Sequence, residues 1–162
     1  MLPPWNHLHP AIVHFPIALL MVAPLLVLVG LLWPGQRRGL HAAALILLVL
    51  GFGALLLAME SGEAVERFAR ATPALLGGLR DHELAAQKAT LIFGLLGAGF
   101  AALWVTPLVR RRALAPHVEL GLLVFWLFLA AGGVLALARA GHLGGHLVHD
   151  LHTHARPETG VR

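Results

Sequence analysis

The stretch Pro10–Trp33, PAIVHFPIALLMVAPLLVLVGLLW, decides the class of this protein, because its only ionisable side chain is His14. A helix that crosses about 30 Å of hydrocarbon needs about 20 apolar residues, and this stretch is long enough. Three later segments have the same character: residues 40–58, 84–106 and 118–138. The sequence therefore predicts an all-α membrane protein, a bundle of four transmembrane helices.

The composition agrees with this class. Hydrophobic residues make up 58% of the 162 residues and charged residues only 12%, and a soluble domain would carry about twice that charge fraction. No segment shows the alternating polarity of a transmembrane β-strand. We expect a single domain over residues 1–162, whose last part, residues 139–162, is a histidine-rich segment outside the membrane.

Proline and glycine residues indicate where the predicted helices begin, bend or end. Pro34-Gly35 is expected to end the first helix, and Pro107 the third, because proline lacks a backbone donor and clashes with the preceding turn. Pro10 suits a first helical turn, and Pro16 removes one further donor, so we expect an open or kinked backbone near His14.

The absence of cysteine narrows the kinds of metal and haem site that this chain can form. It excludes thiolate zinc sites, cysteine-ligated iron–sulfur clusters and covalently attached haem. A metal or haem must therefore be held by histidine, carboxylate, methionine or backbone. The basic isoelectric point, near 11.4, does not require nucleic acid, since the arginines flank membrane segments.

The arginines also predict the orientation. Arg37 and Arg38 lie in the first connection, and Arg110, Arg111 and Arg112 in the third. Short, dense clusters of this kind mark the cytoplasmic side. Four spans place both termini on the other side, so we expect both termini outside, in the periplasm of a Gram-negative cell.

Histidines gather on that outer side of the membrane. Nine of the eleven histidines precede or open the first span, open the third or follow the fourth: His7, His9, His14, His82, His142, His146, His149, His152 and His154. Imidazole is the commonest protein ligand for transition metals and haem iron. We expect His14, His82 and His142 to be buried ligands, and His9, His146 and His149 to form a second shell or second site. The other three are expected to face solvent.

Other polar residues lie at the same helix ends. Glu60 and Glu63 are three residues apart at the end of the second span, and Asp81 is a fair N-cap for the third. Gln87, Lys88 and Thr90 indicate a polar outer cavity. The Gly144-Gly145 pair would let a flat group or another backbone approach closely.

The second connection, residues 60–83, is the longest. Glu63 to Arg70 is expected to form a short surface helix that ends at Thr72-Pro73, and Gly77-Gly78 to form a flexible return. This connection is either a lid over the histidines or an ordinary interfacial connector.

Two motifs resemble those of a bacterial membrane-protein family, domain of unknown function family 2231. The first is HPxxVHFPIAL, from His9 to Leu19. The second is similar to GHxGGxLxHG, matched by Gly141, His142, Gly144, Gly145, Leu147 and His149, with Asp150 in place of the last glycine. His82 matches a histidine at the start of the family's third helix. The resemblance implies a four-helix inner-membrane protein, often encoded or fused with cytochrome c or Rieske-type modules.

Three functions are compatible with these residues. The leading hypothesis is a b-type haem protein that transfers electrons near the outer membrane face, with ligands among His14, His82 and His142 and with His149 near the propionates.

The second hypothesis is a non-haem metal-binding membrane protein. Its copper, zinc or iron site would be built from His14, His82, His142, His146, Glu60, Glu63 and Glu83. The third is a cofactor-free subunit of a redox complex, in contact with quinone or a partner. No catalytic motif is recognised, so we expect an electron carrier or subunit rather than a stand-alone enzyme.

Overall fold

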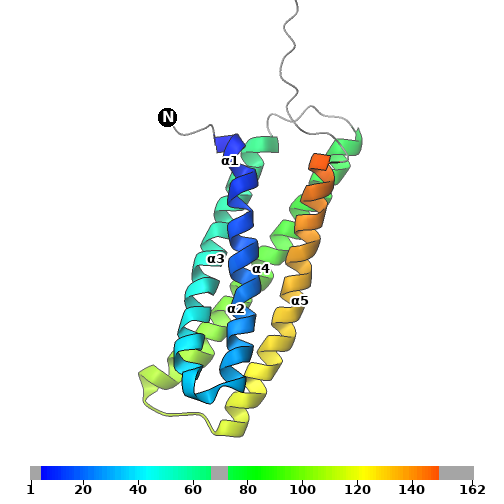
Figure 1. Cartoon of the computed structure of the whole chain (residues 1–162). Helices are drawn as coiled ribbons and strands as arrows, with labels where there is room; N and C mark the ends of the chain where they lie inside the picture. Colours follow the sequence, from blue (N-terminus) through cyan, green and yellow to red (C-terminus); the bar gives the residue numbers. More distant parts are fainter. Residues whose placement is uncertain (1–4, 67–72, 150–162) are drawn as a thin grey trace, which may run out of the picture.

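The chain forms a bundle of long, roughly antiparallel helices (Figure 1). The computed structural model describes residues 5–66 and 73–149, and helix is the only regular secondary structure in these residues. The elements are α1 (Trp5–Ile12), α2 (His14–Leu32), the 3-10 turn η1 (Pro34–Gln36), α3 (Arg37–Glu66), α4 (Pro73–Arg110) and α5 (Pro116–His149).

Four stretches of helix are long and apolar enough to cross a membrane: His9–Leu32, Pro34–Glu63, Leu75–Arg110 and Pro116–Val148. The prediction of an all-α bundle of four transmembrane helices is confirmed. The start of α1 and the last turn of α5 lie at one end, which we call the terminal end, and the arginine clusters lie at the other, which we call the arginine end (Figure 1).

The helices extend beyond the predicted spans, and this corrects the prediction for the second connection. Pro73 begins α4, and Gly77-Gly78 lies inside that helix instead of forming a flexible return. Proline is favoured at a first helical position, where its missing N–H has no intrahelical partner. On the other side α3 continues to Glu66; the rest of the predicted surface helix lies outside the described residues.

Prolines act differently from the prediction at two further places. Pro107 does not end α4, which continues to Arg110 and stops where Arg111 takes a φ of 52°. Pro10 lies inside α1, which already begins at Trp5. The predicted irregularity near His14 is present, because α1 and α2 separate at Val13. Pro16 cannot donate to the carbonyl four residues earlier, which weakens the helix at this junction.

Apolar side chains fill the centre of the bundle. The largest fully buried ones are Phe93 and Phe100 of α4 and Leu20 of α2. Trp126 of α5 packs against Phe100 and donates a hydrogen bond from Nε1 to the Leu96 carbonyl at 2.9 Å. This bond satisfies the polar edge of a buried ring and fixes α5 against α4.

Large apolar side chains also cover the outside of the bundle. They include Phe15, Leu25, Leu91, Phe125, Phe128 and Leu135. In water such a surface would be unfavourable, whereas the hydrocarbon core of a membrane is its natural surrounding. The exposed faces therefore point to a lipid bilayer as the environment of this chain.

Candidate histidine site

His9, near the end of α1, is hydrogen-bonded to another helix, α3, close to the end of that helix. Its Nδ1 lies 2.8 Å from Oγ of Ser61 in α3. Ser61 is fully buried, and its hydroxyl donates a second bond to the Ala58 carbonyl at 2.9 Å. A serine hydroxyl has one hydrogen. Because Ala58 receives that hydrogen, Ser61 accepts from His9, and the proton of the His9 ring is on Nδ1.

His82, in α4, is held in the same way by α5. Its Nδ1 lies 3.0 Å from the backbone carbonyl of Ala140. A carbonyl oxygen only accepts, so Nδ1 is the donor here too. His9 and His82 lie close enough for an electrostatic interaction between their rings. The terminal end therefore brings together two half-buried histidines from α1 and α4.

The two rings have the same tautomer. With the proton on Nδ1, the Nε2 atom of each neutral ring carries a lone pair. Histidines that bind metals almost always donate their other ring N–H to a carbonyl, carboxylate or water, which fixes the ring and raises its basicity as a ligand. His9 and His82 already have this second partner. Their Nε2 atoms are suited to accept a proton or to coordinate a metal.

Glycines lie beside both rings. A Cβ added to Gly62 would lie 3.2 Å from Cε1 of His9, and one added to Gly144 would lie 3.0 Å from Cε1 of His82. These glycines give the imidazoles the space that side chains would otherwise fill. Gly145, which was predicted to share this role, has nothing within 4 Å of a built Cβ.

The prediction that His14 and His142 are buried is wrong. Both side chains are exposed on the bundle. His14 uses Nδ1 to bond the Pro10 carbonyl of its own turn, at 2.6 Å. His14 lies two residues, about 200° of helical rotation, from the buried Pro16, which puts it on the opposite face. His142 stands in the same relation to the buried Ala140. Of the three predicted buried ligands, only His82 points into the site.

The other predicted metal ligands do not form a cluster within the described residues. Glu60, Glu63, Glu83 and His146 are exposed, and Glu83 accepts a hydrogen bond from Gln87 at 2.9 Å. Residues 5–66 and 73–149 hold no group of three or more metal-ligating side chains arranged around one position. The side chain of His149, and residues 150–162 with His152 and His154, lie outside the described part.

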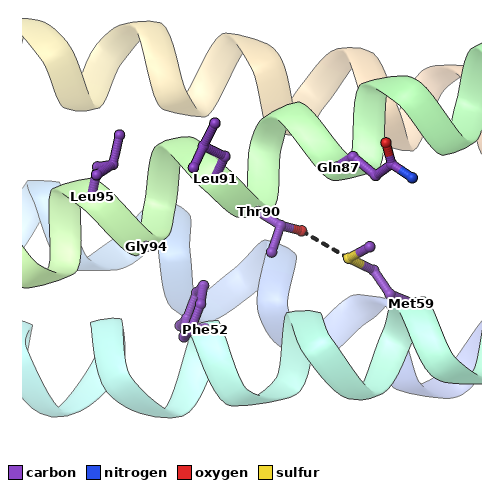
Figure 2. A pocket seen from close by; sticks show the side chains of 7 residues that line it. All are labelled: Phe52, Met59, Gln87, Thr90, Leu91, Gly94 and Leu95. Atoms are coloured by element: carbon purple, nitrogen blue, oxygen red, sulfur yellow. Dashed lines mark hydrogen bonds between the residues drawn. The ribbon is translucent and has the colours of Figure 1, made fainter.

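A groove with a volume of about 370 Å³ lies between α3 and α4 (Figure 2). Its lining is almost entirely apolar, although Gln87 and Thr90 contribute to it. Thr90 turns its hydroxyl to the Ala86 carbonyl and to Sδ of Met59, at 2.8 and 3.1 Å. The predicted polar cavity is therefore an apolar groove, and none of the histidines lines it.

Comparison with known protein families identifies the family of this chain. A family described as a predicted membrane protein, DUF2231, matches residues 6–157. The chain belongs to this family. No curated protein and no solved structure matches it. The matched region contains all four membrane-spanning stretches of this DUF2231 protein, together with His9, Ser61 and His82.

Sequence reasoning missed two residues of this DUF2231 chain. Ser61 was passed over in the segment between two glutamates, although a small hydroxyl residue beside Gly62 was a usable signal. His41, in α3 near the arginine end, is not among the nine histidines that the sequence analysis singled out. It is instead one of two buried polar side chains among the described residues, the other being Ser61.

Proposed function

We propose that this membrane protein binds haem b at its terminal end, where His9 and His82 would hold the iron, and that the protein transfers electrons. The observation that carries the proposal is the shared tautomer of the two rings: each donates Nδ1–H to a fixed acceptor, at 2.8 Å to Ser61 and at 3.0 Å to Ala140. Both Nε2 atoms are thereby left for an iron ligand bond.

The number of protein side chains that could bind a metal ion at this site favours haem over a non-haem metal. A porphyrin supplies four nitrogen ligands, so haem iron needs only one or two from the protein. Catalytic and structural zinc sites take three or four protein ligands. His9 and His82 are a pair, and the described residues contain no larger group. When bound, haem would supply one-electron redox chemistry, and the chain would supply the two imidazoles and the apolar surroundings.

The glycines beside the rings support the same proposal. Gly62 and Gly144 let the rings of His9 and His82 lie directly against the backbones of α3 and α5, where an added Cβ would lie 3.2 and 3.0 Å from Cε1. A ring can approach the backbone more closely at glycine than at any other residue, so the two imidazoles that would hold the iron are fixed in place. His14 and His142, the ligands first expected, have exposed side chains.

Absorption spectroscopy tests the proposal directly. The protein is expressed with ample haem, purified in lipid nanodiscs and measured as reduced minus oxidised spectra. We expect a Soret band and the sharp α-band of a six-coordinate haem. His9→Ala and His82→Ala should each remove this α-band, because each removes one of the two imidazoles that would hold the iron.

Matched controls come from the exposed histidines. His14→Ala and His142→Ala should keep the wild-type spectrum. A preparation without a Soret band overturns the haem proposal, and so does an unchanged α-band in His9→Ala or His82→Ala. Metal analysis of the same sample then separates a non-haem metal from no cofactor.

One observation favours a second candidate, a cofactor-free subunit of a membrane redox complex. The bonds of His9 to Ser61 and of His82 to Ala140 each join two helices. A buried hydrogen bond between helices stabilises a membrane bundle by itself, by about 0.6 kcal/mol on average. Co-purification of another redox protein, together with the absence of haem and metal, selects this candidate.

A further inference from the structure

The last turn of α4, at the arginine end (Figure 1), holds three consecutive arginines in a fixed backbone conformation. The N–H of Arg112 donates to the Pro107 carbonyl at 3.2 Å. The N–H of Arg111 donates to the Leu108 carbonyl at 3.4 Å. These two bonds form the Schellman turn that ends many helices, in which the left-handed residue is usually glycine. Here Arg111 takes that position, with a φ of 52°, so a strained backbone holds Arg110, Arg111 and Arg112 at the surface.

These arginines have no acidic partner in the part of the chain that the structure describes. Glu119 is the one acid at the arginine end in residues 5–66 and 73–149, and its Oε1 lies 3.6 Å from Nη1 of Arg37. Arg110, Arg111 and Arg112 are exposed and form no ion pair in those residues. The carboxyl end of a helix carries about half a negative charge, which one arginine balances. The three arginines therefore leave an excess of positive charge that attracts an anion.

Apolar side chains lie next to this positive charge on the same helix. Val105, Leu108 and Val109 are exposed near the end of α4, Val109 to 73%. Their spacing of three and four residues puts them on one face of the helix. Because α4 contains one of the four membrane-spanning stretches, this face meets acyl chains. The end of α4 thus offers an apolar face followed by a cluster of cations, in the same order as the acyl chains and the charged headgroup of a phospholipid.

We propose that the end of α4 binds an anionic phospholipid. Its three arginines bind the phosphate of the headgroup, and Val105, Leu108 and Val109 contact an acyl chain. A guanidinium group is planar and donates two parallel hydrogen bonds to a phosphate, so arginine suits this role better than lysine. A zwitterionic headgroup carries a cation of its own, which the arginines repel. A headgroup without that cation, such as phosphatidylglycerol, is therefore preferred. The inference does not depend on haem, because it uses no residue of the terminal end.

Native mass spectrometry of the full-length protein in detergent micelles tests the site, because this method resolves each bound lipid molecule. Phosphatidylglycerol and phosphatidylcholine with the same acyl chains are titrated separately, and we expect phosphatidylglycerol to bind more tightly. Arg112→Gln should weaken the binding of phosphatidylglycerol roughly fivefold, the change that corresponds to the usual attraction of one cation to an anionic membrane surface. Arg80→Gln, which changes an exposed arginine near the start of α4, is the matched control and should bind this lipid as wild type does.

A second variant separates lipid binding from the structural role of the turn. Glycine suits the left-handed position, so Arg111→Gly should be at least as stable as wild type in denaturant, while its affinity for phosphatidylglycerol falls roughly fivefold. Excess inorganic phosphate should not displace the lipid from the wild-type protein, because phosphate makes no contact with the apolar face.

The proposal is overturned if wild type binds the two lipids equally, or if Arg112→Gln or Arg111→Gly binds phosphatidylglycerol as wild type does. An equal loss of affinity in Arg80→Gln and Arg112→Gln also overturns it, because the overall charge of the protein would then explain the binding. Release of the lipid by inorganic phosphate would identify a site for free anions instead of a lipid site.

Discussion

Three histidines of this chain, His9, His14 and His82, donate from Nδ1, yet they differ in what that bond does. His14 bonds the Pro10 carbonyl in its own turn and stays on the surface. His9 and His82 bond groups on other helices, more than fifty residues away in the sequence. A bond within one turn fixes only a rotamer, whereas a bond between helices fixes the ring relative to the whole bundle. Position within the fold, not residue type, separates the candidate ligands from the other histidines.

The space beside His82 gives a prediction at this scale. In Gly144→Ala the new methyl group would lie 3.0 Å from Cε1 of His82 and 3.4 Å from Nδ1, so the ring must shift by a few tenths of an ångström, which disturbs its bond to the Ala140 carbonyl. We expect a loss of about 1–3 kcal/mol in the free energy of unfolding, the usual cost of overpacking. Gly145→Ala is the matched control, because its Cβ meets nothing within 4 Å. Equal unfolding free energies for the two variants in mixed micelles would contradict the tight approach.

Ser61 gives a second prediction for a single side chain. Ser61→Ala removes the acceptor of the His9 Nδ1–H bond and the donor to Ala58. We expect the protein to lose about 1 kcal/mol of stability, since two hydrogen bonds are lost and each contributes about 0.6 kcal/mol in a membrane bundle. We also expect His9 to show both neutral tautomers in its ring ¹⁵N shifts instead of one. Glu63→Gln, two residues further and exposed, serves as the control, and a His9 ring that keeps its single tautomer in Ser61→Ala would contradict the assignment.

Among the helices, α2 and α3 approach each other at a glycine. A Cβ on Gly51 would lie 2.7 Å from Cδ2 of Leu20 and 3.2 Å from Cβ of Leu19. Leu20 is fully buried and has no free direction in which to retreat. Small residues at helix contacts allow this kind of close packing in membranes, where dispersion contacts replace the hydrophobic effect.

The prediction for this contact compares two glycines of one helix. Gly51→Ala should destabilise the bundle by about 1–3 kcal/mol, because α2 must shift to admit the methyl group. Gly53→Ala, whose Cβ meets nothing within 4 Å, should be neutral or stabilise α3 by up to about 1 kcal/mol, since alanine is the better helix former. Unfolding in mixed micelles measures both changes, and a Gly51→Ala protein as stable as wild type would show that the helices are not in close contact there.

Which faces of these helices meet could not be read from the sequence. In a soluble helix, polarity marks the outward face. Here Leu91 and Leu95 face outward and Phe93 faces inward, and all are apolar, so hydropathy carries no information on rotation about the helix axis. The existence of the four spans followed from the length of the four apolar segments. The inward direction of His82 and the outward direction of His14 and His142 depend on helix rotation, and therefore needed the structure.

The same limit explains the missed residues. The bond of His9 to Ser61 joins residues that no spacing rule connects. His41 lies only four residues after Arg37, and a sequence reading treats such a histidine as part of the solvated helix end. Its burial depends on Gly30 of α2, which lets the two helices come together over the ring. Contacts between segments that are distant in the sequence determine both the His9–Ser61 bond and the burial of His41, and the sequence around each residue does not predict such contacts.

For the molecule as a whole, the His9–His82 pair and the buried His41 lie at opposite ends of one four-helix bundle, so the compartment that each of them faces depends on the orientation of the bundle in the membrane. The arginine clusters predict that the arginine end faces the cytoplasm, which would put the His9–His82 pair outside and His41 inside.

Labelling of single cysteines tests this orientation. The chain has no cysteine of its own, so a cysteine introduced at one position reports the topology without background. Gly35, in η1, and Glu63, near the end of α3, are both exposed and lie at opposite ends. We expect a membrane-impermeant maleimide to label Glu63→Cys in intact spheroplasts, and Gly35→Cys only after the membrane is opened. The reverse pattern would invert the orientation and place the histidine pair inside, and labelling of both variants in intact spheroplasts would contradict four complete spans.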